Sequence, residues 1–182
     1  MQETTLAYPI GRFQAPDAID ASARDAFVAH IELAPASLRN AIEGLDERQL
    51  DTPYRPGGWS VRQVVHHLPD SHLNAYVRFK LALTEDKPTI RPYDQARWAE
   101  LPEAMAGPVR LSLDLLANLH ARWVACIRAL SPESFDRTFR HPEQGVMSLN
   151  RQLALYAWHG RHHVAHITSL RTREGWVLPK GA

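Results

Sequence analysis

The sequence contains a single cysteine, Cys126, among its 182 residues. One cysteine cannot close a disulfide within the chain, which excludes a disulfide-rich secreted scaffold and suits a reducing compartment. The sequence also lacks any run of about 18 apolar residues and any basic start followed by an apolar stretch. Neither a membrane span nor a signal peptide is therefore expected, and we predict a cytoplasmic protein with no membrane partner.

An excess of charge of one sign is also missing. Lys and Arg number 21 against 20 Asp and Glu, which gives a formal net charge of +1. Binding to nucleic acid needs a clustered excess of basic side chains that neutralise phosphates, so no nucleic-acid partner is expected. Strand signals are weak throughout, and the best of them is a short hairpin within residues 136–147.

The apolar periodicity predicts four long helices, which is typical of an all-α four-helix bundle. We expect these helices at residues 22–44, 61–84, 108–130 and 148–174, with one short helical turn at residues 46–50. Ser60 and Ser148 are expected to cap the second and the fourth helix, because a serine hydroxyl accepts a hydrogen bond from the first turn.

Length and proline positions predict how these helices are organised. A chain of 182 residues is expected to form one domain, residues 1–182, with an extended arm over residues 1–20. Pro35 is expected to kink or break the first long helix, and Pro69 to bend the second, because proline lacks the backbone N–H of a helix interior. Residues 85–107 are long for a connection and predict a crossover or a lid.

The composition is unusual in its ten histidines. Three lie near the start of the second predicted helix, and four lie within the fourth. In the fourth helix a spacing of four residues, which places two side chains on one face, occurs twice, as His159/His163 and as His162/His166. The spacing alone does not choose between these two pairs.

A helical projection at about 100° per residue separates the two pairs. His159 and His163 lie closer to the apolar stripe of their helix than the other pair does. On the second predicted helix His67 lies at the edge of the stripe, His72 within it and His66 almost opposite. Neutral imidazoles suit Zn, Ni, Fe or Cu, and a site with three protein ligands leaves a coordination position open for chemistry.

Other polar and aromatic residues have simpler interpretations beside functional ones. Histidines that point inward singly are usually satisfied core residues, an interpretation that covers His30, His72 and His120, and His141 is expected to be exposed. Asp70, one turn beyond His67, is either an acceptor for that imidazole, a base or a solvated carboxylate. Cys126 is expected to be a small packed side chain. The candidates to line a pocket or bind an anionic group are Trp59, Trp98, Trp123, Trp158, Arg55, Arg78, Arg91 and Arg97.

The histidines belong to two longer motifs. Residues 54–74 have the sequence YRPGGWSVRQVVHHLPDSHLN, and residues 156–167 have the sequence YAWHGRHHVAHI. Together with residues 8–13, 79–84 and 87–93, these motifs resemble the DinB superfamily, and more narrowly its YfiT-like branch. Members of that branch are described as metal-dependent hydrolases and as bacillithiol transferases. In the zincin proteases, by contrast, a glutamate follows the first histidine of the pair, and this chain has glycine there.

The resemblance implies a bundle in up-down-down-up order, often a homodimer, with one divalent ion, Zn or Ni, held by His67, His159 and His163. Where members of the family commonly have alanine two residues after the first ligand, this chain has Pro69, which leaves the local helix geometry open. No role is assigned to His66, His162 or His166. No catalytic residue is assigned either. The leading hypothesis is a metal-dependent S-transferase that transfers a low-molecular-weight, bacillithiol-like thiol to an electrophilic substrate. The alternatives are a metal-dependent hydrolase using metal-bound water and a non-catalytic metal-binding protein.

Overall fold

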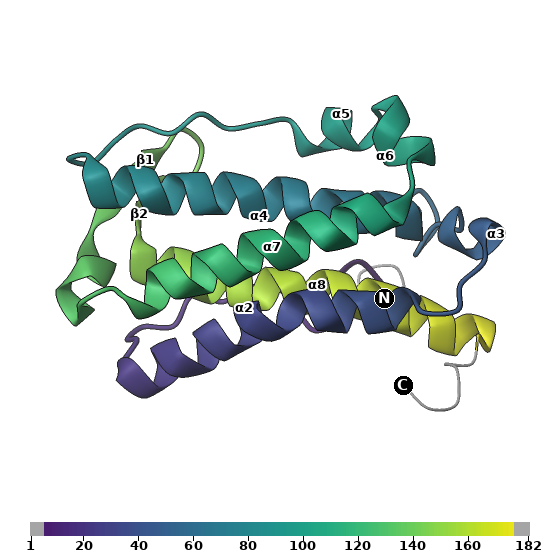
Figure 1. Ribbon diagram of the computed structural model, residues 1–182, viewed down its shortest axis with the longest axis horizontal. Helices are drawn as coiled ribbons and strands as arrows, with labels where there is room; N and C mark the ends of the chain where they lie inside the picture. Colours follow the sequence, from purple (N-terminus) through teal and green to yellow (C-terminus); the bar gives the residue numbers. More distant parts are fainter. Residues whose placement is uncertain (1–5, 177–182) are drawn as a thin grey trace.

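Four long helices lie side by side in the computed structural model, which describes residues 6–176 (Figure 1). They are α2 (Ala21–Ile42), α4 (Val61–Thr84), α7 (Val109–Arg128) and α8 (Leu149–Glu174). Helices α2 and α8 run in one direction and α4 and α7 in the other (Figure 1). The predicted all-α bundle in up-down-down-up order is therefore confirmed. Within the described part, none of the helices has the length and hydropathy needed to cross a bilayer.

The connection between α4 and α7 runs back along the bundle, because two parallel neighbours cannot be joined by a short turn (Figure 1). It contains two short helices that the apolar periodicity did not predict, α5 (Gln95–Ala99) and α6 (Pro102–Ala106). The Gln63 side chain on α4 donates a hydrogen bond to the Ala99 carbonyl at 2.7 Å. The predicted crossover is thus present, and it is held against α4.

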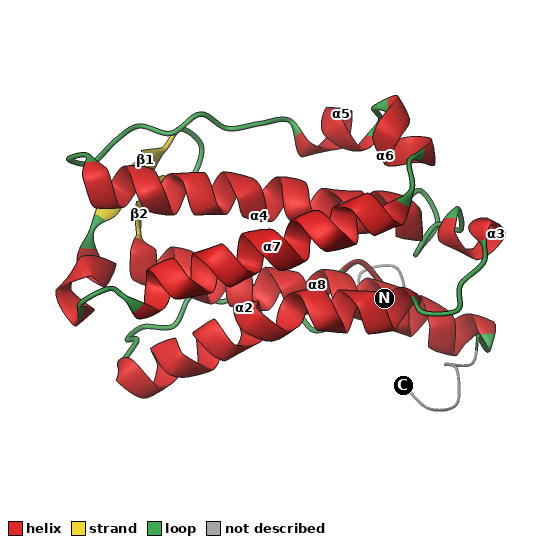
Figure 2. Cartoon of the chain, in the orientation of Figure 1, coloured by secondary structure: helices red, strands yellow, loops and turns green. Residues whose placement is uncertain are grey.

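The remaining elements are short (Figure 2). Strands β1 (Thr138–His141) and β2 (Gly145–Ser148) form the predicted hairpin, and α3 (Glu47–Leu50) is the predicted short helical turn. A 3-10 helix, η1 (Pro132–Asp136), precedes the hairpin. The Ser60 and Ser148 side chains accept hydrogen bonds from the first turns of α4 and α8, as expected for N-caps.

Of the two outcomes expected at Pro35, a kink or a break, the break was wrong, because α2 continues through this residue. Proline leaves the carbonyl of Ile31, four residues earlier, without its helical partner, and His120 Nδ1 occupies that position at 2.5 Å. A tertiary hydrogen bond thus replaces the one that the helix loses. The N-terminal arm is not extended throughout, because Leu6 and Ala7 are helical.

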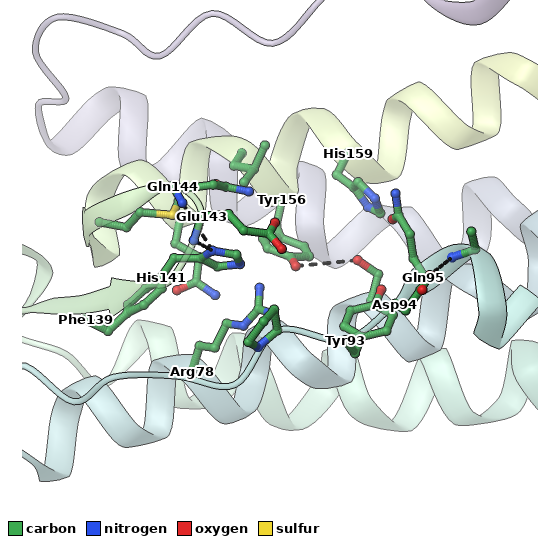
Figure 3. A pocket seen from close by; sticks show the side chains of 16 residues that line it. Arg78, Tyr93, Asp94, Gln95, Phe139, His141, Glu143, Gln144, Tyr156 and His159 are labelled. Carbon is green, nitrogen blue, oxygen red and sulfur yellow. Dashed lines mark hydrogen bonds between the residues drawn. The ribbon is translucent and has the colours of Figure 1, made fainter.

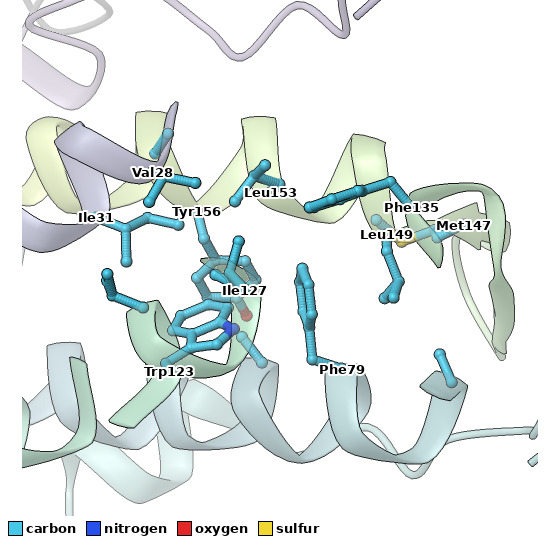
Figure 4. Close-up of a cluster of buried hydrophobic side chains, with 14 of the residues drawn as sticks. Val28, Ile31, Phe79, Trp123, Ile127, Phe135, Met147, Leu149, Leu153 and Tyr156 are labelled. Atoms are coloured by element: carbon cyan, nitrogen blue, oxygen red, sulfur yellow. The ribbon is translucent and has the colours of Figure 1, made fainter. Parts of the chain in front are cut away.

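The apolar core consists of two clusters at opposite ends of the bundle. One lies near the hairpin, where Phe79 and Trp123 pack with their ring centroids 5.4 Å apart (Figure 4). The other lies near α3 and includes Leu116 and Ile167. Between the clusters α4, α7 and α8 place a layer of polar side chains, which we call the histidine layer. Its members are His67, His72, His120, His159 and His163.

Helix α8 approaches α2 closely at Gly160, inside the histidine layer. A β-carbon at this position would lie 3.2 Å from the Ala34 β-carbon and 3.7 Å from His72 Cε1. The absence of a side chain allows the two backbones to pack together.

Replacing Gly160 with valine is expected to destabilise the fold by about 1–3 kcal/mol, because the added methyl groups overlap Ala34. This cost exceeds the gain in helix propensity that comes from removing a glycine. Denaturant unfolding of Gly160→Val checks the value. Arg161→Val, on the exposed face of the same helix, is the control, and equal stability of the two variants would contradict the prediction.

Candidate metal centre

Three imidazoles converge in the middle of the bundle. His67 comes from α4, and His159 and His163 come from successive turns of α8. One ring nitrogen from each of them lies within 4.8 Å of the others, and His67 Nε2 is 3.4 Å from His159 Nε2. The structure therefore brings together the three histidines that the sequence singled out, including the one from a different helix.

Burial keeps these imidazoles neutral. His67 is 4% exposed, and burial lowers its pKa to about 4. Burial is also the main cause that lowers the pKa of His159 and His163 well below 6.5, and the neighbouring imidazoles add to it. At neutral pH each ring therefore has a free lone pair, which is the form that binds a metal ion.

The geometry and chemistry of the group fit a divalent ion. Two nitrogens bound to one tetrahedral Zn²⁺ lie about 3.3 Å apart, close to the 3.4 Å between His67 Nε2 and His159 Nε2. His163 Nδ1 is buried and has no hydrogen-bond partner in the described part of the chain. A set of three neutral imidazoles suits Zn²⁺ or Ni²⁺ and leaves at least one coordination position for a small molecule.

The second pair on α8, His162 and His166, has a different environment. The His162 ring stacks on Trp158 with centroids 4.3 Å apart. The His166 ring stacks on Tyr54 at 3.9 Å, and its Nε2 is 3.1 Å from the Ala7 carbonyl oxygen. This pair packs against the N-terminal segment and the loop before α4, and it does not belong to the three-histidine group.

Two histidines lie in places that the projection did not anticipate. His66 was placed opposite the apolar stripe, yet it is buried, with Nδ1 2.7 Å from Ser112 Oγ and Nε2 3.2 Å from the Gly107 carbonyl oxygen. His141 was expected to be exposed and is 5% exposed. A projection of one helix cannot show that the crossover covers its polar face, and the hairpin buries His141 in the same way.

A cavity of about 710 Å³ opens on one side of the three-histidine group (Figure 3). His159 and Gln95 lie toward one end, and Arg78 and His141 lie farther along it (Figure 3). Arg78, one of the predicted anion-binding candidates, thus points its charge into a cavity that reaches the candidate metal site. The other polar side chains that line it include Ser71, Tyr93, Asp94, Glu143, Gln144, Gln152 and Tyr156.

A second cavity, of about 430 Å³, lies on the other side of the group. Arg55, Trp59 and Trp158 line it, as predicted for pocket residues, together with His159 and His163. His159 and Gln95 line both cavities. His159 therefore lies between the two cavities, and His163 faces the smaller one.

Several sequence candidates lie outside these cavities. Trp123 belongs to the apolar core. Trp98 lines neither cavity, but its ring contacts Tyr93, which lines the larger one. The remaining candidates that line neither cavity are Arg91, Arg97 and Cys126. Asp70 does not hydrogen-bond to His67 in the described part of the chain. Burial, with a contribution from Glu103, raises its pKa to about 6.

The chain is similar to known proteins of one family. The model of a family described as DinB superfamily matches residues 30–167. A protein named "Putative metal-dependent hydrolase" from Bacillus mycoides strain KBAB4 is 54% identical over 171 residues, which cover 94% of this chain and 98% of that protein. A protein of the same name from Bacillus cereus strain 03BB102 has the same identity and coverage.

Two solved structures share the fold. YfiT from Bacillus subtilis is described as "a probable metal-dependent hydrolase with an unusual four-helix bundle topology". It superposes with a TM-score of 0.93 at 48% identity, covering 95% of this chain and 99% of its own. TT2238, described as "a four-helix bundle protein", gives a TM-score of 0.56 at 20% identity over 80% of this chain and 98% of its own. The second similarity concerns the fold alone.

Proposed function

The chain belongs to the DinB superfamily, and from this membership and the three-histidine group we infer that it is a metal-dependent enzyme. We propose that His67, His159 and His163 hold one divalent ion, Zn²⁺ or Ni²⁺, and that the reaction transfers a low-molecular-weight thiol to an electrophilic substrate. The resemblance to bacillithiol transferases supports the choice of a small thiol.

The observation that carries this proposal is that His159 lines two cavities. Their volumes, about 710 and 430 Å³, lie in the range typical of small-molecule sites. A transferase must hold two molecules with their reacting atoms at one point, whereas hydrolysis needs room for one substrate and a water. Two chambers that share one wall at the candidate metal site suit the two-substrate reaction.

The chain's own residues bind and orient the two molecules. When bound, a divalent ion held by three neutral imidazoles supplies Lewis acidity, which lowers the pKa of a thiol or a water beside it. Arg78 provides a positive charge for an anionic group in the larger cavity, and Trp59 and Trp158 provide apolar walls in the smaller one. In the transfer the thiol loses its proton to solvent water and its sulfur forms a bond to the electrophilic carbon, while the bond from that carbon to the leaving group breaks and the leaving group departs with the electron pair. Cys126 lines neither cavity, so the sulfur arrives with a co-substrate.

Hydrolysis with the same three ligands is the second candidate. The names of the relatives favour it, since they are described as metal-dependent hydrolases. The cytoplasmic location and the homodimer expected from the sequence stay predictions. So do the thiol and electrophile as partners and the absence of a nucleic-acid partner.

A paired assay distinguishes the two reactions. The Zn²⁺-loaded protein is mixed with a panel of aryl halides, epoxides and activated esters, with and without bacillithiol or cysteine. We expect product only when thiol is present, and a rate that falls by more than about 100-fold in His159→Ala, because the ion is lost. Ester cleavage at the same rate without thiol would instead establish the hydrolase.

A further inference from the structure

A chain of hydrogen bonds leads from the candidate metal site through the core to α2. His159 Nδ1 is 3.1 Å from His72 Nε2, on α4. His72 Nδ1 is 2.9 Å from His120 Nε2, on α7. His120 Nδ1 is 2.5 Å from the carbonyl oxygen of Ile31, on α2. The chain crosses all four helices of the bundle and uses both nitrogens of each buried imidazole.

Pro35 explains why the chain ends at Ile31. In a regular α-helix the Ile31 carbonyl would accept the N–H of the residue four positions later, and that residue is Pro35, which has no N–H. The carbonyl is therefore free to accept a hydrogen bond from another helix. Because a carbonyl oxygen only accepts, His120 Nδ1 must be the donor.

This terminal acceptor sets the direction of every bond in the chain. A neutral imidazole, the form that burial favours, has one N–H and one lone pair. With its N–H on Nδ1, His120 accepts at Nε2, so His72 donates from Nδ1 and accepts at Nε2. His159 must then donate from Nδ1. The lone pair of His159 is left on Nε2, the atom that lies 3.4 Å from His67 Nε2.

We propose that the hydrogen-bonded series of His72, His120 and the Ile31 carbonyl, which we call the relay, holds His159 in the tautomer whose Nε2 lone pair faces the metal ion. Pro35 contributes by leaving the Ile31 carbonyl free to accept from His120. His72 and His120 are positioning residues, since they act through His159. The role toward the ion rests on the proposed metal site, whereas the tautomer itself does not. An acceptor that takes the N–H of the second nitrogen of a ligating histidine fixes both the tautomer and the orientation of that ring.

Burial makes the order of the relay strict. His72 is fully buried and His120 is 2% exposed, between the two apolar clusters. Reversing any one bond would set two donors or two lone pairs against each other, with no water to satisfy them. In a series of imidazoles that is open to solvent this constraint would be lost, because water can hydrogen-bond to any N–H or lone pair that has no protein partner.

The tautomer of His159 is measured directly by long-range ¹H–¹⁵N correlation spectroscopy of the full chain without metal. We expect a protonated Nδ1 and an unprotonated Nε2 at His159 in the wild-type protein, and a shift toward the other tautomer in His72→Leu. Protonation of Nε2 in the wild-type protein would overturn the proposal. The measurement on the wild-type protein requires neither a stable variant nor a bound ion, so it decides the relay even if the proposed function fails.

Zn²⁺ affinity, measured by competition with a chromophoric chelator, tests the consequence for the site. His72→Leu is expected to bind Zn²⁺ about 10–100-fold more weakly. His72→Gln is expected to recover most of the affinity, because its amide oxygen accepts the His159 N–H. His66→Leu removes a buried histidine of the same helix that bonds elsewhere, and it should bind as the wild type does. Unchanged affinity in His72→Leu, or equal losses in the leucine and glutamine variants, would overturn the role of the relay in metal binding.

Discussion

Alanine substitution of His163 is expected to remove the divalent ion from the protein and to lower the affinity for Zn²⁺ by more than about 100-fold. One ring nitrogen of His163 lies within 4.8 Å of the nitrogens of His67 and His159, and a site with only two imidazoles holds an ion weakly. The same loss is expected for His67→Ala and His159→Ala. Elemental analysis of the purified proteins and chelator competition measure the two quantities.

His166→Ala is the matched control for this experiment. His166 lies on the same helix and belongs to a pair with the same spacing, but its ring stacks on Tyr54 and lies outside the three-histidine group. We expect this variant to keep its metal. Equal metal content in the wild type and in His163→Ala would refute the site, and loss of metal from His166→Ala alone would assign it to the other pair.

The metal-free protein is expected to lose stability steeply as the pH falls from about 6.5 to 4. Burial lowers the pKa of His120 from 6.5 to about 4 in the folded state, so the unfolded chain binds a proton first. The free energy of unfolding is therefore unaffected by this group above the unfolded pKa of 6.5. It decreases as the pH falls below that value, until the folded pKa of about 4 is reached. This single group contributes a loss of about 3 kcal/mol, and His67, whose pKa is also lowered to about 4 by burial, adds a loss of the same sign.

Urea unfolding at a series of pH values measures this slope. In His120→Asn the side chain at position 120 no longer titrates, but its amide N–H can still donate a hydrogen bond to the Ile31 carbonyl. The slope of unfolding free energy against pH should therefore decrease by up to about 1.4 kcal/mol per pH unit between pH 6 and 4.5. The comparison uses slopes because the substitution also changes the stability at neutral pH. An identical slope in the two proteins would show that His120 is protonated equally in both states.

Much of the fold was predictable because its signals are local. The apolar periodicity of residues 61–84 predicted α4 with both of its ends. Ser148 marked the start of α8, since an N-cap acts on the adjacent turn alone. The i, i+4 spacing likewise placed His159 beside His163 before any tertiary contact was known.

Features that depend on distant parts of the chain were not predictable in this way. Helix α2 passes through Pro35 because His120, which is 89 positions away from Ile31 in the sequence, supplies the missing donor. His66 is buried because Gly107 and Ser112, 41 and 46 positions away, lie over it. A helical projection contains no information about such neighbours, so it placed His66 only by its position almost opposite the apolar stripe.

The sequence by itself determined four helices, their ends and the histidines that each helix carries, since all of these follow from interactions within one or two helical turns. Only the tertiary structure decided that His67 meets the α8 pair, that His159 lines two cavities and that His72 and His120 connect this site to the Ile31 carbonyl. These arrangements depend on how four helices pack, and that packing sets the distances between residues far apart in the chain.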